Sequence, residues 1–242
     1  ACCIATLLVG FSGLLAVLLF GLLANLCYHS SLDIYDSMLT DVSKGQNIGK
    51  ISGFGTAFGY FGTIIAVAIA YFMGRTYGFE SPFTIKSMFV VTAALFLGSS
   101  LFTFAMIKEK STTRLNLRHF KEGVKRVLFT IRNFNEFKHV WLFLLASFLY
   151  VDAANTVIIF LFLFGRDQIG LSLAQFLPIY VIMSLAAIAG AFFFGKITDR
   201  VGHKKTLLGI LIFWIEAIFI LRFHLSYITF MFAGILGGGL LG

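Results

Sequence analysis

Charged residues are scarce in this sequence of 242 residues. Asp, Glu, Lys and Arg make up 12% of the chain, whereas about a quarter is usual in a soluble domain. Residues 168–195 contain none of the four. Hydrophobic residues make up 59% of the chain and the mean hydropathy is +0.93. This composition excludes an ordinary soluble domain and indicates an integral membrane protein.

Cysteine is also rare, and two of the three cysteines are adjacent in an apolar run. They offer neither a metal-ligand spacing nor a disulfide framework, so the sequence predicts no metal ion and no cofactor. Ten-residue segments of alternating polarity, which are typical of membrane barrels, are missing as well. Because lipid leaves no partner for unpaired backbone groups, the apolar runs are expected to be α-helices.

Uncharged runs long enough to cross a bilayer recur along the chain. A bilayer core of about 30 Å needs about 20 helical residues at a rise of about 1.5 Å each. Asp152 and Glu216 are the two charges inside such runs. The predicted spans are 13–32, 51–74, 87–107, 140–165, 173–195, 206–221 and 223–242.

The first apolar stretch contains "GFSG" at 10–13, which predicts a turn. Residues 1–10 would then be the end of an earlier span. The last run reaches residue 242 without a polar stop and the chain opens on Ala. We therefore expect a fragment with seven full or nearly full spans and part of an eighth.

The basic residues are distributed unevenly, which matters more than the net charge of +8. If spans alternate, 15 of the 19 Lys and Arg residues fall on one side. The opposite loops carry Arg75, Lys86, Arg166 and Arg222. This positive-inside asymmetry predicts that the basic loops are cytoplasmic. Since topology accounts for the basic face, no nucleic-acid partner is expected.

One long polar segment, 108–139, interrupts the spans and divides the chain into two bundles. Within it, "FKEGVKRVLFTI" places Phe120, Val124, Val127 and Leu128 on one helical stripe, bordered by basic residues. A helix lying along the inner membrane surface and a solvated linker helix both fit this pattern.

A short polar turn between two apolar runs, "GKITDRVGHKKTLLG" at 195–209, concentrates charge. It resembles the signature loop of the major facilitator superfamily, which reads G-x-x-x-D-R-x-G-R/K-R/K. The residues at the defined positions of this pattern or within it are Gly195, Asp199, Arg200, Gly202, His203, Lys204 and Lys205.

The residue types suit a cytoplasmic gate. The two glycines permit close helix approach and a sharp reversal, and the Asp199 carboxylate can face a helix N-terminus or a guanidinium. The resemblance implies a latch that breaks when the carrier opens inward, with its partner at the start of span eleven, beyond this chain. The alternative is a plain positive-inside anchor.

Further segments are similar to the autophagy-related vacuolar effluxer and Unknown Major Facilitator branch. They are "ANLCYHSSLDIYDSMLTDV" (24–42), "ISGFGTAFGYFGTIIA" (51–66), "YVDAANTVI" (150–158) and the glycine-rich end of the chain. The resemblance implies an all-α integral membrane fold, a partial major-facilitator bundle with seven to eight of twelve transmembrane helices. It implies an N-terminal part at 1–107, a cytoplasmic linker at 108–139 and the first part of a C-terminal half at 140–242.

Polar residues inside the spans are candidates for the transport pathway. Asp152 lies near the middle of an apolar run, where charge is costly, and Asn155 follows on the same helical face. A structural hydrogen bond between helices is the alternative. The inner half of the 13–32 span and its extension are also polar, and Asp33 and Asp36 could simply lie at the interface. These further candidates are Asn25, Tyr28, Ser31, Asp33 and Asp36.

Small residues at steps of three or four, Gly55, Gly59 and Gly62, predict tight helix packing. A sliding interface during alternating access is the functional alternative. For Glu216 the sequence suggests only a contact with a neighbouring helix.

Two rival classes compete with a transporter. "GFSG" matches the nucleophile pattern of rhomboid proteases, but four of the five His residues lie in loops or at membrane edges and His29 is too close along the chain. A channel would need repeated pore-loop motifs, and a scaffold would not transport. We expect no enzyme.

The resemblance implies a secondary-active transporter that exports amino acids or small peptides, with protons as the candidate coupling ion. Another drug or sugar exporter and a non-transporting membrane protein are the alternatives. We expect a monomer in a prokaryotic inner membrane, with the vacuolar membrane as the alternative location.

Overall fold

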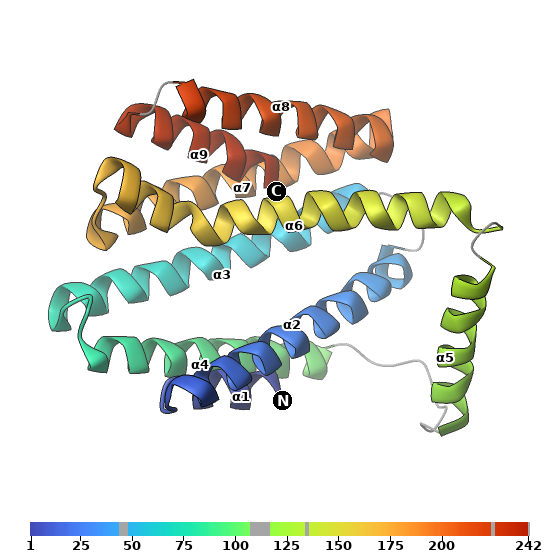
Figure 1. Ribbon diagram of the computed structural model, residues 1–242, viewed down its shortest axis with the longest axis horizontal. Coiled ribbons are helices and arrows are strands. Elements are labelled where there is room, and N and C mark those ends of the chain that lie inside the picture. Colours follow the sequence, from blue (N-terminus) through green and yellow to red (C-terminus); the bar gives the residue numbers. More distant parts are fainter. Residues whose placement is uncertain (44–47, 107–116, 134–135, 224–225, 242) are drawn as a thin grey trace. The chain divides into compact units, whose positions relative to one another are not determined.

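The protein folds into α-helices, and the described residues of this computed structural model contain no strand. They are 1–43, 48–106, 117–133, 136–223 and 226–241; at 38–43 and 117–120 only the helical backbone is described. The helices are α1 (Cys2–Val9), α2 (Leu14–Ser43), α3 (Ile48–Tyr77), α4 (Pro82–Met106), α5 (Leu117–Arg132), α6 (Lys138–Ile169), α7 (Leu173–Val201), α8 (His203–Phe223) and α9 (Tyr227–Leu241) (Figure 1).

Six of these helices, α2, α3, α4, α6, α7 and α8, are long and apolar enough to cross a membrane. Each contains one of the first six predicted spans, or most of it, and most extend beyond it into polar residues. α9 has 15 residues, or about 22 Å of helix, which is shorter than a bilayer core. The all-α membrane fold expected from the sequence is thus confirmed.

The turn predicted at 10–13 is present between α1 and α2. The backbone N–H of Gly10 donates to the carbonyl of Leu7, and the Ser12 hydroxyl donates to the carbonyl of Leu8 at 2.6 Å. Cys2 lies back against α2, with its Sγ 3.5 Å from the Ala24 carbonyl oxygen.

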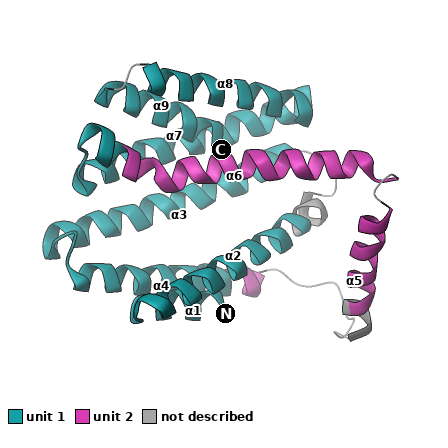
Figure 2. Cartoon of the chain, viewed as in Figure 1, with its two compact units in different colours: residues 1–101, 165–242 teal, residues 102–164 magenta. Residues whose placement is uncertain are grey.

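The chain divides into two compact units, coloured separately in Figure 2. Unit 1 comprises residues 1–101 and 165–242, and unit 2 comprises residues 102–164. Unit 1 holds α1–α3, most of α4, α7–α9 and the last turn of α6. Unit 2 holds α5 and most of α6.

α7 is the central helix of unit 1, because α3 packs on one of its faces and α9 on another. Ala187 and Ala191 of α7 are almost completely buried. On the α9 side, Gly190 meets the backbone of Gly239, and Phe230 is buried. The start of α7 is fixed by Ser172, which exchanges hydrogen bonds with Gln175 in a capping box.

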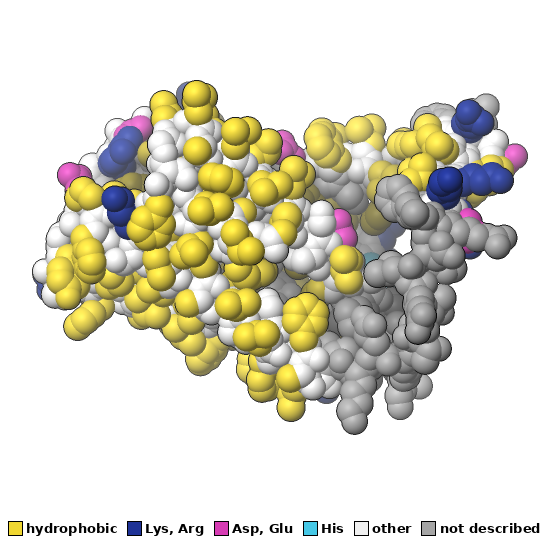
Figure 3. All heavy atoms as spheres, turned by 90° about the horizontal axis from the view of Figure 1, so that it is seen from below, with side chains coloured by type: hydrophobic (Ala, Val, Ile, Leu, Met, Phe, Trp, Pro, Cys, Tyr) yellow, Lys and Arg dark blue, Asp and Glu magenta, His cyan; other side chains and the backbone are white. Residues whose placement is uncertain are grey.

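Hydrophobic side chains cover much of the face shown in Figure 3. Leu14 and Phe104 are 80% exposed, and Phe72 is 72% exposed. Such surfaces would be unfavourable in water but are normal against lipid tails. The exposed surface therefore agrees with a membrane environment.

Candidate functional site: a clamp between two helices

The polar turn at 195–209 is a tight junction between α7 and α8. Gly202 lies between the two helices and has a φ of 95°. Residues that have a Cβ rarely adopt this backbone conformation. Its N–H donates to the Thr198 carbonyl at 3.0 Å, and its own carbonyl accepts from the Thr206 hydroxyl at 3.1 Å. A glycine is therefore required where the sequence motif has one.

Asp199, near the end of α7, binds the start of α3. Its Oδ1 accepts a hydrogen bond from the backbone N–H of Gly49 at 2.9 Å, and its Oδ2 accepts one from Lys50 at 2.9 Å. These N–H groups belong to the first turn of α3, where no intrahelical acceptor exists and the helix dipole favours negative charge. We call this contact between Asp199, Gly49 and Lys50 the Asp199 clamp.

Glycines on both helices make the clamp possible. A Cβ placed on Gly49 would lie 2.7 Å from the Gly195 carbonyl oxygen and 2.8 Å from Asp199 Oδ1. A Cβ on Gly195 would lie 2.6 Å from the Gly49 carbonyl oxygen. One turn further along, Gly53 meets the backbone of Ala191. The backbones of α3 and α7 are therefore in direct contact beneath the clamp.

The clamp corrects one expectation from the sequence. The partner of Asp199 was expected beyond this chain, at the start of span eleven, but the described residues place it in α3. The two partners are 150 and 149 residues apart, and no local pattern marks a contact over that distance. Gly49 and Lys50 are the site residues that sequence reasoning missed. Gly49 and Gly53, four residues apart at the start of a span, indicate close helix packing but do not identify the partner helix.

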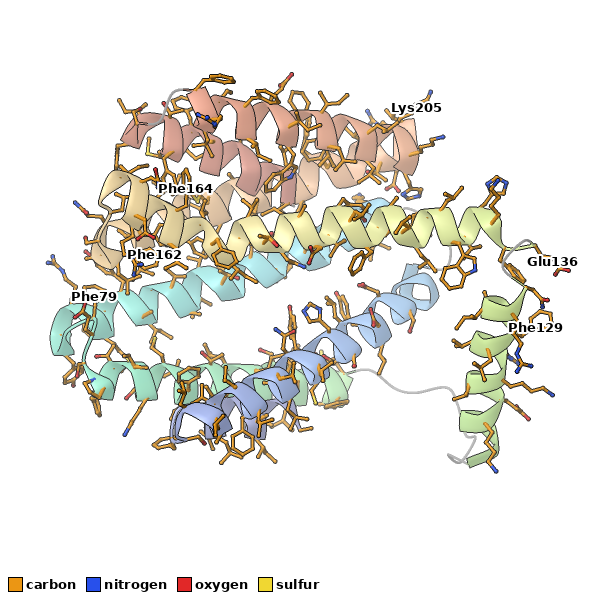
Figure 4. The ribbon with its side chains drawn as sticks, in the orientation of Figure 1. Phe79, Phe129, Glu136, Phe162, Phe164 and Lys205 are labelled. Atoms are coloured by element: carbon orange, nitrogen blue, oxygen red, sulfur yellow. The ribbon has the colours of Figure 1, made fainter. Side chains whose placement is uncertain are left out.

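The other charged motif residues point outward around the same junction. Arg200, His203, Lys204 and Lys205 are all exposed. Lys205, labelled in Figure 4, lies in the first turn of α8. The junction thus presents a basic surface, while the Asp199 carboxylate is hydrogen-bonded to α3.

The polar face of α2 is exposed at each predicted pathway residue: Asn25, Tyr28, Ser31, Asp33 and Asp36. The Ser31 hydroxyl is turned back onto its own helix, where it donates to the Tyr28 carbonyl at 2.7 Å. The Tyr28 ring lies edge-on to Phe96 of α4, with 6.3 Å between ring centroids.

Tyr28 also belongs to a group of tyrosines that the sequence analysis did not identify. Tyr60 on α3 interacts electrostatically with Tyr180 on α7 and Tyr28 on α2. Tyr60 and Tyr180 are half-buried. We call these three residues, which come from three helices, the tyrosine cluster (Tyr28, Tyr60 and Tyr180). The sequence signal for each of these tyrosines was a hydroxyl group in an otherwise apolar span.

Asp152 and Asn155 lie on α6 within unit 2, and both are exposed. Their assignment to the transport pathway stays a prediction. Glu216 on α8 is exposed as well, and the structure gives it no role.

The predicted glycine stripe is only partly engaged in the described structure. A Cβ on Gly55 would approach the Tyr35 hydroxyl at 2.7 Å. No heavy atom of the described residues lies within 4 Å of a Cβ placed on Gly59 or Gly62. Close packing of α3 in unit 1 depends instead on Gly49, Gly53 and Ala57, which are buried. A packing role for Gly59 and Gly62 stays a prediction.

The apolar helices and the Gly–Asp-Arg–Gly junction that binds the start of another helix define a multi-pass membrane protein of the major facilitator type. Residues 39–221 match the family model described as "Vacuole effluxer Atg22 like". The chain belongs to this family, as the resemblance in the sequence implied.

A curated relative supports the same class. The chain is 27% identical over 218 residues to the "Uncharacterized MFS-type transporter YxiO" of Bacillus subtilis (strain 168). The match covers 85% of this chain and 49% of the relative, so the chain spans about half the length of that protein. No solved structure matches the chain.

Proposed function

We propose that this chain is part of a secondary-active transporter that exports amino acids or small peptides by alternating access. The observation that carries the proposal is the Asp199 clamp. A carboxylate bound to the first turn of another helix can be released when the helices separate, because water satisfies both groups. Such a contact can stabilise a closed cytoplasmic side without making closure permanent.

The family and the tyrosine cluster support the choice of solute. The family's name describes vacuole effluxers, and the resemblance implies amino acids or small peptides. Phenol groups offer hydrogen bonds and aromatic faces, and aromatic faces attract ammonium groups. The tyrosine cluster therefore suits the amino group of a zwitterionic solute.

Proton coupling belongs to the same proposal, with Asp152 as the titrating group. An acidic side chain inside a span is costly unless it faces protein or water, and such residues are common in proton pathways. We place the protein in a bacterial inner membrane, in keeping with its bacterial relative, and we expect the full-length protein to act as a monomer without nucleic acid.

Counterflow in proteoliposomes tests the proposal. Full-length protein containing this chain is reconstituted into vesicles preloaded with one unlabelled amino acid or dipeptide from a panel. Labelled solute should accumulate transiently in these vesicles, to a higher level than in vesicles without protein. Exchange of sugars or lipophilic drugs instead would favour the alternative exporter, and absence of exchange across all panels would favour a non-transporting protein.

A matched pair of variants locates the solute site. Tyr60→Phe removes one hydroxyl from the tyrosine cluster and should raise the half-saturating concentration about 2- to 10-fold, the value of one hydrogen bond. Tyr71→Phe is the control, because Tyr71 lies on the same helix with its ring under Arg75, 5.8 Å from the ring centroid to the guanidinium carbon. Equal effects of both variants would remove the tyrosine cluster from the pathway.

A further inference from the structure

α5 has an apolar stripe that is open to its surroundings. Val124, Val127, Leu128 and Ile131 follow the i, i+3, i+4, i+7 spacing of one helical face. Their exposed fractions are 44%, 60%, 49% and 49%. The described residues of unit 2 therefore do not cover the stripe.

Within unit 2, α5 and α6 are not among the helix pairs with extended contact in the described residues. A solvated linker helix would hold the apolar stripe in water, which is unfavourable. An apolar surface outside unit 2 is therefore needed to cover the stripe.

A row of basic residues runs along one edge of the stripe. Lys121, Lys125 and Arg132 are separated by four and seven residues, so they share one side of α5, next to Leu128. Arg126 lies on the face opposite the stripe. Glu122 is the single acidic residue within the α5 sequence. The edge of the stripe is therefore positively charged.

The chain holds α5 near the membrane. α6, which is long enough to span, begins at Lys138, six residues after α5 ends. Six residues reach at most about 20 Å when fully extended. A bilayer surface is thus within reach of the stripe wherever α6 is inserted.

We propose that α5 lies along the surface of an anionic membrane. Its stripe enters the boundary between headgroups and acyl chains, and Lys121, Lys125 and Arg132 bind the phosphates of anionic lipids. An apolar face bordered by Lys and Arg is the pattern of helices that bind in this way. This inference does not depend on the transported solute.

Quenching of a fluorophore on α5 tests the inference in the full chain. Cys2, Cys3 and Cys27 are replaced by Ser, and the dye NBD is attached to Val127→Cys or, as control, to Arg126→Cys. The protein is placed in nanodiscs of phosphatidylcholine, with or without about one quarter phosphatidylglycerol. The quenchers are nitroxide-labelled lipid and aqueous acrylamide.

In anionic nanodiscs the dye at position 127 should be quenched by the lipid nitroxide and protected from acrylamide. The dye at position 126 should show the opposite preference. Added salt should reduce the lipid contact, because exposed charges are screened.

Charge variants identify the headgroup contact. Lys121→Gln, Lys125→Gln and Arg132→Gln should each lower the ratio of membrane-bound to water-exposed α5 about fivefold in anionic nanodiscs. Arg126→Gln, on the other face, should change this ratio less. Lys125→Arg keeps the positive charge and should leave the ratio at its original value.

Three results would overturn the proposal. Acrylamide quenching that is equal at positions 126 and 127 would mean a solvated helix. Protection of position 127 from both quenchers would mean that the stripe packs on protein. Lipid contact that is the same in neutral and anionic nanodiscs would remove the role of the basic row.

Discussion

Asp199 accepts two backbone hydrogen bonds with one charged carboxylate, which makes both stronger than bonds between neutral groups. The side chain is exposed, so water competes for it and screens its charge. A contact of this kind can close one side of a carrier and still open within a transport cycle. Its strength, rather than its presence, is what an experiment must measure.

We expect Asp199→Asn to shift the equilibrium toward separation of α3 and α7. The amide keeps one acceptor oxygen but loses the charge that favours a helix N-terminus, a loss of about 1 kcal/mol or roughly fivefold in the equilibrium. Spin labels on Lys50→Cys and Lys196→Cys, in the chain without its native cysteines, should report longer distances. Coupled transport should fall while the protein stays folded.

Asp167→Asn is the matched control for this variant. Asp167 is also exposed and charged, but it pairs with Arg166 at 2.8 Å on the surface, where ion pairs contribute little. If Asp199→Asn and Asp167→Asn leave the label distances equally unchanged, the motif is only a positive-inside anchor.

Asp152 is the residue proposed to couple transport to protons. Asp152→Asn keeps the size and hydrogen-bonding capacity of the side chain but cannot exchange a proton. If the residue couples protons, accumulation driven by a pH gradient should be lost while solute exchange in counterflow continues. If the residue binds the solute, both should be lost. The measurement is uptake of labelled solute with and without the gradient.

Glu216→Gln serves as the control for Asp152→Asn, since Glu216 is another exposed acid within a span. It should leave both modes of transport near their original rates. Full accumulation with normal pH dependence in Asp152→Asn would assign Asp152 to structural contacts between helices.

At the scale of helices, the crossing of α3 and α7 depends on the absence of side chains at defined positions. Gly53→Ala would drive a Cβ into the Ala191 backbone, so α3 and α7 must move apart. We expect a loss of stability of about 1–3 kcal/mol, as in other overpacked sites. Thermal unfolding in detergent, followed by tryptophan fluorescence, should show a lower midpoint.

Gly59→Ala provides the opposite expectation on the same helix. No heavy atom of the described residues lies within 4 Å of its added Cβ, and Ala is favoured over Gly in a helix by about 1 kcal/mol. Its unfolding midpoint should stay the same or rise. If Gly53→Ala and Gly59→Ala changed the unfolding midpoint equally, a packing role specific to Gly53 would be contradicted.

The sequence predicted the helices better than their contacts. Apolar length identified the six helices that are long enough to cross a membrane, because lipid imposes that length on each helix, and the residues "GFSG" identified the turn at 10–13. The sequence selected Gly55, Gly59 and Gly62 as the packing stripe, whereas the close approach of α3 to α7 uses Gly49 and Gly53. Both sets have helical spacing, and only the position of α7 decides between them. The partner of Asp199 was missed for the same reason.

At the scale of the whole molecule, charge distribution and helix contacts agree within unit 1. The Asp199 clamp brings the start of α3 beside the end of α7, so Lys50, Lys196 and Lys204 lie at one end of these helices. Arg75 lies 25 residues further along α3, or about 38 Å away. The separation of basic and less basic ends is therefore built into the packing of the helices.

We predict that the clamped end faces the cytoplasm, because basic loops remain on that side during insertion. Lys121→Cys and Lys204→Cys, in the chain without its native cysteines, should react with an impermeant maleimide only after the membrane is opened. Arg75→Cys, Arg166→Cys and Arg222→Cys should react from outside in intact cells. Lys44→Cys, which lies outside the described residues, is predicted to behave like Lys204→Cys. Equal labelling from outside at positions 121 and 166 would contradict the assignment of spans, since those positions are separated by one crossing of α6.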